Sequence, residues 1–235
     1  TNNNLLVTLS DKNCIDQAKQ LFSSVYFNAG WKDDYMLLAH EIPENQLKWF
    51  KEKGILIYNC EPIYKDTIGM GYNPVILDKL YLFSEYFKKW DKIIFLDSDV
   101  IVKGSLNRLT KINKFAAADS TIRLGKQFSN DGKLYNEIRK NYKLNKKSFN
   151  TGLFVLPTSL IQENTLYDIL QLYKKYQSIA DCNEESILNL YFYNDWKLLP
   201  GIYNYFVSVH MVEGKKHKRI KALVYHFIKI TGHEK

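Results

Sequence analysis

Two aspartates one residue apart, Asp97 and Asp99, stand between the apolar runs 93–96 and 100–102. A short apolar run predicts a buried strand, and an unpaired carboxylate at its end is costly without a counter-charge, a donor or a metal. Both carboxylates can therefore face one divalent cation, and that cation can in turn hold a diphosphate. The alternative interpretation is structural, because an Asp at a strand end often only begins a turn.

The composition limits the class of protein. A chain of 235 residues with 46% hydrophobic residues is long enough for one large domain with a sizeable core. The net charge of +8 is carried by 29 Lys against 4 Arg, and such a surface attracts phosphates, anionic glycans, nucleic acid or membranes. Arg is the favoured side chain for reading nucleic acid. Because the chain has only 4 Arg, we expect no nucleic-acid partner.

The cysteines and the hydropathy bear on the cellular compartment. Cys14, Cys60 and Cys182 are far apart and odd in number, so they form neither a disulfide framework nor a zinc motif. No apolar run approaches the length of a membrane span, and no signal-peptide pattern is visible. We therefore expect that the chain has no membrane span and lies in a reducing compartment, the cytoplasm. A homodimer is left open.

Strands and helices alternate along the chain. Apolar runs predict strands, and helical periodicity predicts the helices between them: strands at 5–9, 35–39, 55–58, 93–96, 115–119, 149–156 and 223–227; helices at 15–27, 43–53, 76–87, 166–173 and 184–192; a loop at 66–73; and a surface helix or insertion at 130–142. This alternation predicts an α/β fold with a central, mostly parallel mixed sheet flanked by helices. Ligands then bind at the carboxyl ends of the strands, where Ser10 and Asp97 lie.

Seven segments occur in an order that resembles glycosyltransferase family 8, and within it the glycogenin-like branch: 7–9, 78–80, 95–99, 149–154, 187–189, 199–204 and 225–227. The resemblance implies a GT-A (Rossmann-like nucleotide-binding) fold, retaining transfer of a hexose (glucose or galactose) from a UDP-sugar to a glycan or protein acceptor, and a Mn²⁺ ion. We expect a single domain over 1–235, with a nucleotide-binding half at about 1–119 and an acceptor and sugar half at about 120–235.

The resemblance also implies the metal ligands. Asp97 and Asp99 match the acidic pair (the DxD motif), and His226 matches the histidine that completes the protein ligands. Two carboxylates and an imidazole suit Mn²⁺ better than Mg²⁺, which remains the alternative. Taken alone, His226 would more often be a core histidine at a strand end. Lys79 matches a lysine near the donor phosphates.

The donor site that the resemblance implies consists of Thr8, Leu9, Ser10, Ile15, Lys79, Ser98, Asn150, Gly152, Glu184, Glu185 and Lys229. Ile15 stands where a tyrosine commonly stacks on uracil, and Lys229 replaces a lysine of a broken C-terminal motif. Gly152 can let the backbone approach the sugar or mark a strand bulge. Segment 207–212 contains no tyrosine, so self-glycosylation there is not supported.

Glu185 stands where the family carries glutamine beside the reacting carbon. The expected catalytic residues are Asp97, Asp99, Glu185 and Lys79. A carboxylate can be a nucleophile where an amide cannot, but we favour attack by the acceptor from the same face, because the family generally lacks this carboxylate. Glu184 and Glu185 also suit the first turn of a helix, where acidic side chains interact favourably with the helix dipole.

Two other functions are compatible with parts of the sequence. A nucleotidyltransferase or sugar-nucleotide pyrophosphorylase would share the nucleotide-binding sheet and the acidic metal site. It should also carry a Gly-rich phosphate loop after the first strand, and 9–13 contains no glycine. A non-catalytic basic module would bind polyanions in a salt-dependent manner through the basic residues Lys215, Lys216, Lys218, Arg219 and Lys221.

Overall fold

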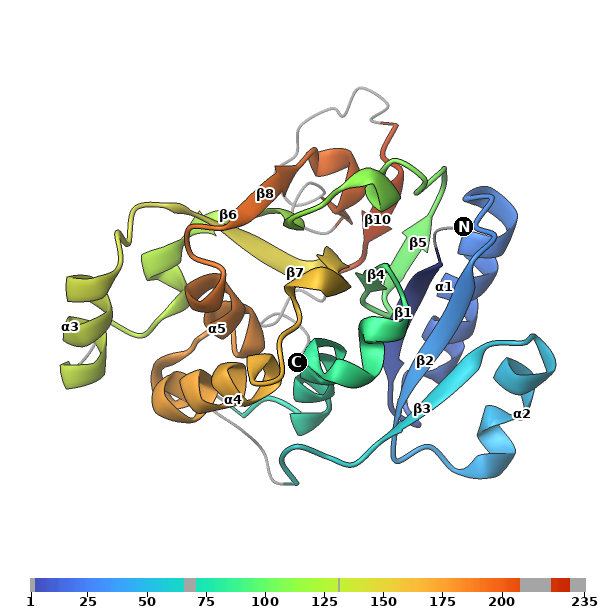
Figure 1. Cartoon of the computed structure of the whole chain (residues 1–235), viewed down its shortest axis with the longest axis horizontal. Coiled ribbons are helices and arrows are strands. Elements are labelled where there is room, and N and C mark those ends of the chain that lie inside the picture. Colours follow the sequence, from blue (N-terminus) through green and yellow to red (C-terminus); the bar gives the residue numbers. More distant parts are fainter. Residues whose placement is uncertain (1–2, 66–70, 131, 208–220, 229–235) are drawn as a thin grey trace, which may run out of the picture.

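The computed structural model of the chain describes residues 3–65, 71–130, 132–207 and 221–228 (Figure 1). Its main sheet has seven strands in the order β3 (Leu56–Cys60), β2 (Asp34–His40), β1 (Asn4–Ser10), β4 (Lys92–Leu96), β7 (Lys147–Pro157), β6 (Phe115–Arg123) and β8 (Trp196–Leu199). The first four strands are parallel to one another, β7 is antiparallel to both of its neighbours, and β8 is parallel to β6. The expected mostly parallel mixed sheet is confirmed.

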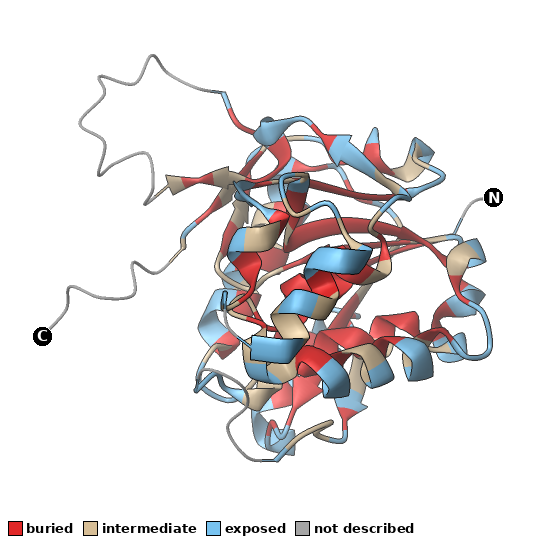
Figure 2. Cartoon of the chain, turned by 90° about the vertical axis from the view of Figure 1, so that its left-hand side faces the viewer, coloured by how far each residue is buried: buried red, intermediate tan, exposed pale blue. Residues whose placement is uncertain are grey.

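Helices cover both faces of this sheet because its strands alternate their side chains between two apolar clusters. Leu6 and Ile94 face one cluster, which includes residues of α1 (Ile15–Asn28) and α2 (Glu44–Glu52). Leu5 and Ile93 face the other cluster, to which the remaining main helices contribute: the 3-10 helices η1 (Pro74–Phe83) and η2 (Glu85–Lys89), and α3 (Gly132–Asn141), α4 (Thr165–Tyr176) and α5 (Glu184–Tyr191). The central strands are accordingly buried along most of their length (Figure 2).

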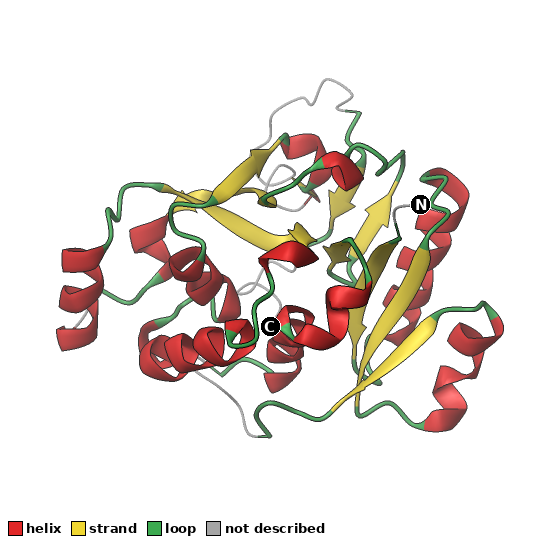
Figure 3. Ribbon diagram, viewed as in Figure 1, coloured by secondary structure: helices red, strands yellow, loops and turns green. Residues whose placement is uncertain are grey.

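A second, three-stranded sheet stands beside the main one (Figure 3). It consists of β5 (Val100–Val102), β10 (Val224–His226) and β9 (Tyr205–Phe206), with β10 in the middle. The chain therefore leaves the main sheet at Asp97 and enters another sheet at Val100, so the apolar runs 93–96 and 100–102 form strands of two different sheets. The carboxylate pair lies in the turn between the two sheets, and the Phe227 amide donates to the Asp99 carbonyl over 3.0 Å.

The segment 76–87 differs from the expected single helix. It forms two 3-10 helices separated at Ser84, which is extended (φ −87°, ψ 156°). Asn73 caps the first of them by accepting a hydrogen bond from the Val75 amide, and Pro74 occupies its first turn. The short strands β8 and β9 were not expected from the sequence. Within the described residues, no helix combines the length and apolarity needed to cross a membrane.

Candidate active site

An open cleft of about 860 Å³ lies at the carboxyl ends of β1 and β4. Both halves of the chain contribute to its walls. Ser10 and the carboxylate pair come from the first half, whereas Asn150 of β7 and Glu185 of α5 come from the second. The cleft therefore occupies the position at which ligands bind in open α/β sheets.

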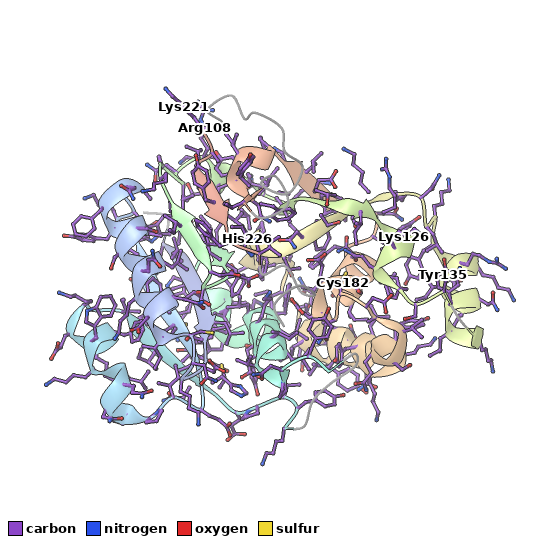
Figure 4. The ribbon with its side chains drawn as sticks, turned by 180° about the vertical axis from the view of Figure 1, so that it is seen from behind. Arg108, Lys126, Tyr135, Cys182, Lys221 and His226 are labelled. Atoms are coloured by element: carbon purple, nitrogen blue, oxygen red, sulfur yellow. The ribbon has the colours of Figure 1, made fainter. Side chains whose placement is uncertain are left out.

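Asp97, Asp99 and His226 converge at this cleft, and one ligand atom from each lies within 4.8 Å of the others. His226 Nε2 is 3.2 Å from an Asp99 oxygen and 3.9 Å from an Asp97 oxygen. The histidine is buried, and each aspartate side chain is about one third exposed, so a cation there can also contact a ligand in the cleft. Figure 4 shows His226 near the middle of the molecule. Two carboxylates and an imidazole form a donor set that fits a divalent transition metal.

Gly152 makes room for the histidine. A Cβ atom at this position would lie 2.2 Å from His226 Cε1 and 2.6 Å from Nδ1. The imidazole therefore packs directly on the backbone of β7, next to the turn that carries the two aspartates. The glycine is required by the position of the ring.

Lys79 is buried beneath the carboxylates. Its Nζ is 3.1 Å from Asp97 and 2.9 Å from Glu184, and it also donates to Thr151 over 3.4 Å. Burial lowers the pKa of Lys79, but the two carboxylates outweigh it and raise the pKa above the usual value. Burial raises the pKa of Asp97, and Lys79 opposes this shift. The lysine thus supplies a fixed positive charge to an acidic cluster that would otherwise be poorly stabilised.

Glu185 is buried at the start of α5 and accepts three hydrogen bonds. The donors are Gln127 Nε2 at 2.7 Å, Asn150 Nδ2 at 2.8 Å and the Thr151 amide at 3.1 Å. Burial nevertheless raises the pKa of Glu185 to about 8, with Glu184 adding to the shift and the Thr151 amide opposing it. The carboxyl group is therefore held in one orientation, with both oxygens engaged.

The structure brings most of the expected site residues together at the cleft: Leu9, Ser10, Lys79, Asp97, Ser98, Asp99, Asn150, Glu184 and Glu185. Thr8, Ile15 and Gly152 are not among the residues that line it. Thr8 is buried and donates to the Leu96 carbonyl over 2.7 Å, and Ile15 packs in the hydrophobic core beneath α1. Lys229 lies outside the described residues.

Further residues of the site were not predicted from the sequence, among them Tyr72 and Asn204. Tyr72 lines the cleft, and its hydroxyl donates over 2.7 Å to the carbonyl of Asp181, just before α5. Asn204 contacts His226 and Asn150 behind the cleft. Asn204 belongs to one of the segments that carry the family resemblance, which was the available signal, whereas nothing local marks Tyr72.

Comparison with known proteins agrees with this fold. The model of the family described as "Glycosyl transferase family 8" matches residues 7–235. The chain belongs to this family. The match supports the family resemblance of the sequence but does not single out its glycogenin-like branch.

One relative and two solved structures illustrate the similarity. The glycosyltransferase GlyF of Streptococcus pneumoniae serotype 4 is 27% identical over 124 residues, which cover 51% of this chain and 27% of GlyF. An active-site mutant of LgtC, with glutamine replaced by glutamate, has a TM-score of 0.74 at 18% identity, covering 96% of this chain and 87% of LgtC. Apo GlyE of Streptococcus pneumoniae has a TM-score of 0.69 at 20% identity, covering 98% of this chain and 55% of GlyE.

The chain thus spans about a quarter of GlyF and about half of GlyE. LgtC and GlyE are GT-A glycosyltransferases, and their likeness confirms the GT-A fold expected from the sequence.

Proposed function

We propose that this chain is a retaining glycosyltransferase that moves a hexose, glucose or galactose, from a UDP-sugar to a glycan or protein acceptor. A divalent cation, Mn²⁺ in preference to Mg²⁺, would be held by Asp97, Asp99 and His226. The observation that carries the proposal is the meeting of these three side chains at the cleft of a family 8 fold. LgtC, a galactosyltransferase, has been solved in complex with donor and acceptor sugar analogs.

The residues of this chain would act by position and charge. When bound, the cation would stabilise the negative charge that develops on the diphosphate leaving group. Lys79 keeps a positive charge next to Asp97, and preorganised charge of this kind stabilises a transition state without reorganisation. The backbone at Leu9 and Ser10 would hold the uridine at the end of β1.

The contacts of Glu185 support attack from the same face rather than a covalent intermediate on this residue. Three donors hold its two oxygens, and a carboxyl group engaged in this way is a weaker nucleophile than a free carboxylate. We therefore expect Glu185→Gln to keep sugar transfer within about 10-fold of the wild type, about 1.4 kcal/mol of barrier. A sugar found covalently attached to the Glu185 peptide by mass spectrometry would overturn this choice.

The experiment that tests the function combines the purified chain with Mn²⁺ and a panel of nucleotide-sugars, and measures nucleotide release and thermal shift. We expect release from a UDP-sugar, and tighter binding of UDP than of GDP or ADP. Asp97→Asn, Asp99→Asn and His226→Ala should each abolish metal-dependent release and remain folded. Asp195→Asn is the control, because Asp195 pairs with Lys114 on the exposed surface. Normal release by any of the three site variants would refute the metal assignment.

Family membership favours glycosyl transfer over the nucleotidyltransferase and over the basic binding module. Of the basic run proposed for that module, the structure describes Lys221 alone, which lies at the periphery in Figure 4, away from His226.

A further inference from the structure

Asn204 lies on the Nδ1 side of His226, between η7 (Gly201–Tyr203) and β9. Its Oδ1 is 2.8 Å from His226 Nδ1, and its Nδ2 donates to Asn150 Oδ1 over 2.7 Å. Both Asn204 and His226 are buried. We propose that Asn204 is a positioning residue that keeps the imidazole hydrogen on Nδ1 and so leaves Nε2 free to bind a metal. This inference rests on the metal site of the proposed function.

The direction of each hydrogen bond follows from one group whose role is fixed. The Gly152 amide can only donate, so the Asn150 atom that lies 2.9 Å away is its oxygen. The Asn150 nitrogen then faces Glu185, to which it donates over 2.8 Å. Because the Asn150 oxygen also faces Asn204, the Asn204 atom at this contact is the nitrogen. The Asn204 oxygen therefore faces His226, and an amide oxygen only accepts, so Nδ1 carries the hydrogen.

This tautomer determines what the other ring nitrogen can do. A neutral imidazole has one N–H donor and one nitrogen with a free lone pair, so the lone pair is on Nε2. Nε2 faces carboxylate oxygens of Asp99 and Asp97 at 3.2 and 3.9 Å. A lone pair directed at two carboxylates is unfavourable unless a positive charge lies between them, which is the position of a shared cation.

Metal-binding histidines usually donate their second ring N–H to a carboxylate, a carbonyl or a water, which fixes the tautomer and the ring orientation. In this chain the acceptor is an amide oxygen, and its orientation is set by Asn150. Asn150 is in turn held by the backbone of β7 and by Glu185. The chain of amides therefore connects the carboxyl group of Glu185 to the candidate metal ligand.

The first measurement needs no metal. Nitrogen-15 NMR of histidine-labelled protein distinguishes the two tautomers by the couplings of the ring nitrogens to the carbon-bound ring hydrogens. The spectrum of His226→Gln identifies the signals of His226 among the five histidines. We expect the neutral ring of His226 in the metal-free wild type to carry its hydrogen on Nδ1. A hydrogen on Nε2 would overturn the inference.

Two substitutions separate positioning from mere packing. Asn204→Leu keeps the number and branching of the side-chain heavy atoms but removes the acceptor, so the Nδ1–H signature should be lost and Mn²⁺ affinity, measured by calorimetry, should fall by about 10- to 100-fold. Asn204→Asp keeps an acceptor for Nδ1–H, and should retain the signature and most of the affinity, even though it loses the donor toward Asn150. Circular dichroism checks that both variants fold.

The remaining outcomes are decisive as well. An Nδ1–H signature retained in Asn204→Leu, or an equal loss of affinity in both variants, would assign Asn204 a packing role and overturn the inference. A wild-type chain that binds no Mn²⁺ would instead overturn the proposed metal site. The tautomer measurement distinguishes that failure, because it tests the contact of Asn204 with His226 independently of any metal.

Discussion

Glu185 is a carboxylic acid in a place where burial opposes its charge. Burial raises its pKa from 4.5 to about 8. In the unfolded chain the group would lose its proton at the lower value, whereas the folded protein retains it until the higher one. The folded state therefore binds more protons between these pH values, so the contribution of Glu185 to the free energy of unfolding falls as the pH rises through this interval and levels off above about 8.

Glu185→Gln removes this pH dependence. We expect the stability of the variant, relative to the wild type, to increase by about 1.4 kcal/mol per pH unit between the two pKa values. Gln127 Nε2 faces Glu185, and turning the Gln127 amide over gives the new amide a partner, because Gln127 Oε1 is buried and has no hydrogen-bond partner among the described residues. Denaturant unfolding with a chelator at several pH values measures the difference. Glu163→Gln, at an exposed position, is the control, and parallel pH profiles of wild type and Glu185→Gln would contradict the expectation.

The turn that begins α5 holds a strained residue. Asn183 has φ 51° and ψ −123°, a conformation that favours glycine, and its buried side-chain amide makes no hydrogen bond within the described structure. Asn183→Gly should therefore raise the free energy of unfolding by about 1 kcal/mol, since relief of strain exceeds the added backbone entropy of glycine. Thermal denaturation measures this change. Asn183→Ala, which removes the amide but keeps Cβ, should gain less, and a lower melting temperature for the glycine variant would refute the strain argument.

The contact between β7 and β10 depends on Gly152. In Gly152→Ala, the new methyl group would overlap the His226 ring, and overpacking of this kind costs about 1–3 kcal/mol. We expect lower stability without metal and, because the ring is displaced from Asp99, a Mn²⁺ affinity reduced at least about 10-fold. Gly201→Ala is the matched control, since no atom lies within 4 Å of its added Cβ. Equal Mn²⁺ titrations for the two variants would show that the ring tolerates the methyl group.

The strands of the main sheet and the helices that cover it were predictable from the sequence wherever an apolar pattern was long. The same pattern also indicates that Ile15 is a core residue, because Ile15 lies three residues before Ala18 on the buried face of α1. Short strands carry little pattern, so β8 and β9 could not be recognised. The helix η1 begins at the cap of Asn73 and ends at the extended Ser84, and periodicity alone does not reveal its 3-10 form.

The site itself was predictable as a set of residue types but not as a network. Asp97, Asp99 and His226 follow from their family positions, and the structure brings them together. The ion pair of Lys79 with Glu184 and the amide chain through Asn204 join residues far apart in sequence, and no local property of one sequence encodes such pairings.

At the scale of the whole molecule, the three-stranded sheet supplies the last residue of the candidate metal site. Residue His226 reaches Asp97 and Asp99 because β10 pairs with β5 and β9. A chain that ends at Lys221 should therefore keep the seven-stranded sheet, seen by circular dichroism, but bind no Mn²⁺ by calorimetry. A chain that ends at Ile228 is the control and should bind the metal. Unchanged binding by the shorter chain would show that His226 is dispensable.

The pairing of β10 with β5 also has a consequence in time. More than half of the chain separates Asp99 from His226, and translation proceeds from the N-terminus, with domains folding as they emerge. The carboxylate pair and every strand of the main sheet are therefore synthesised before the imidazole. A nascent polypeptide halted after β8 would already have its seven-stranded sheet but no complete candidate cation site, so metal binding at that site would coincide with the last steps of synthesis.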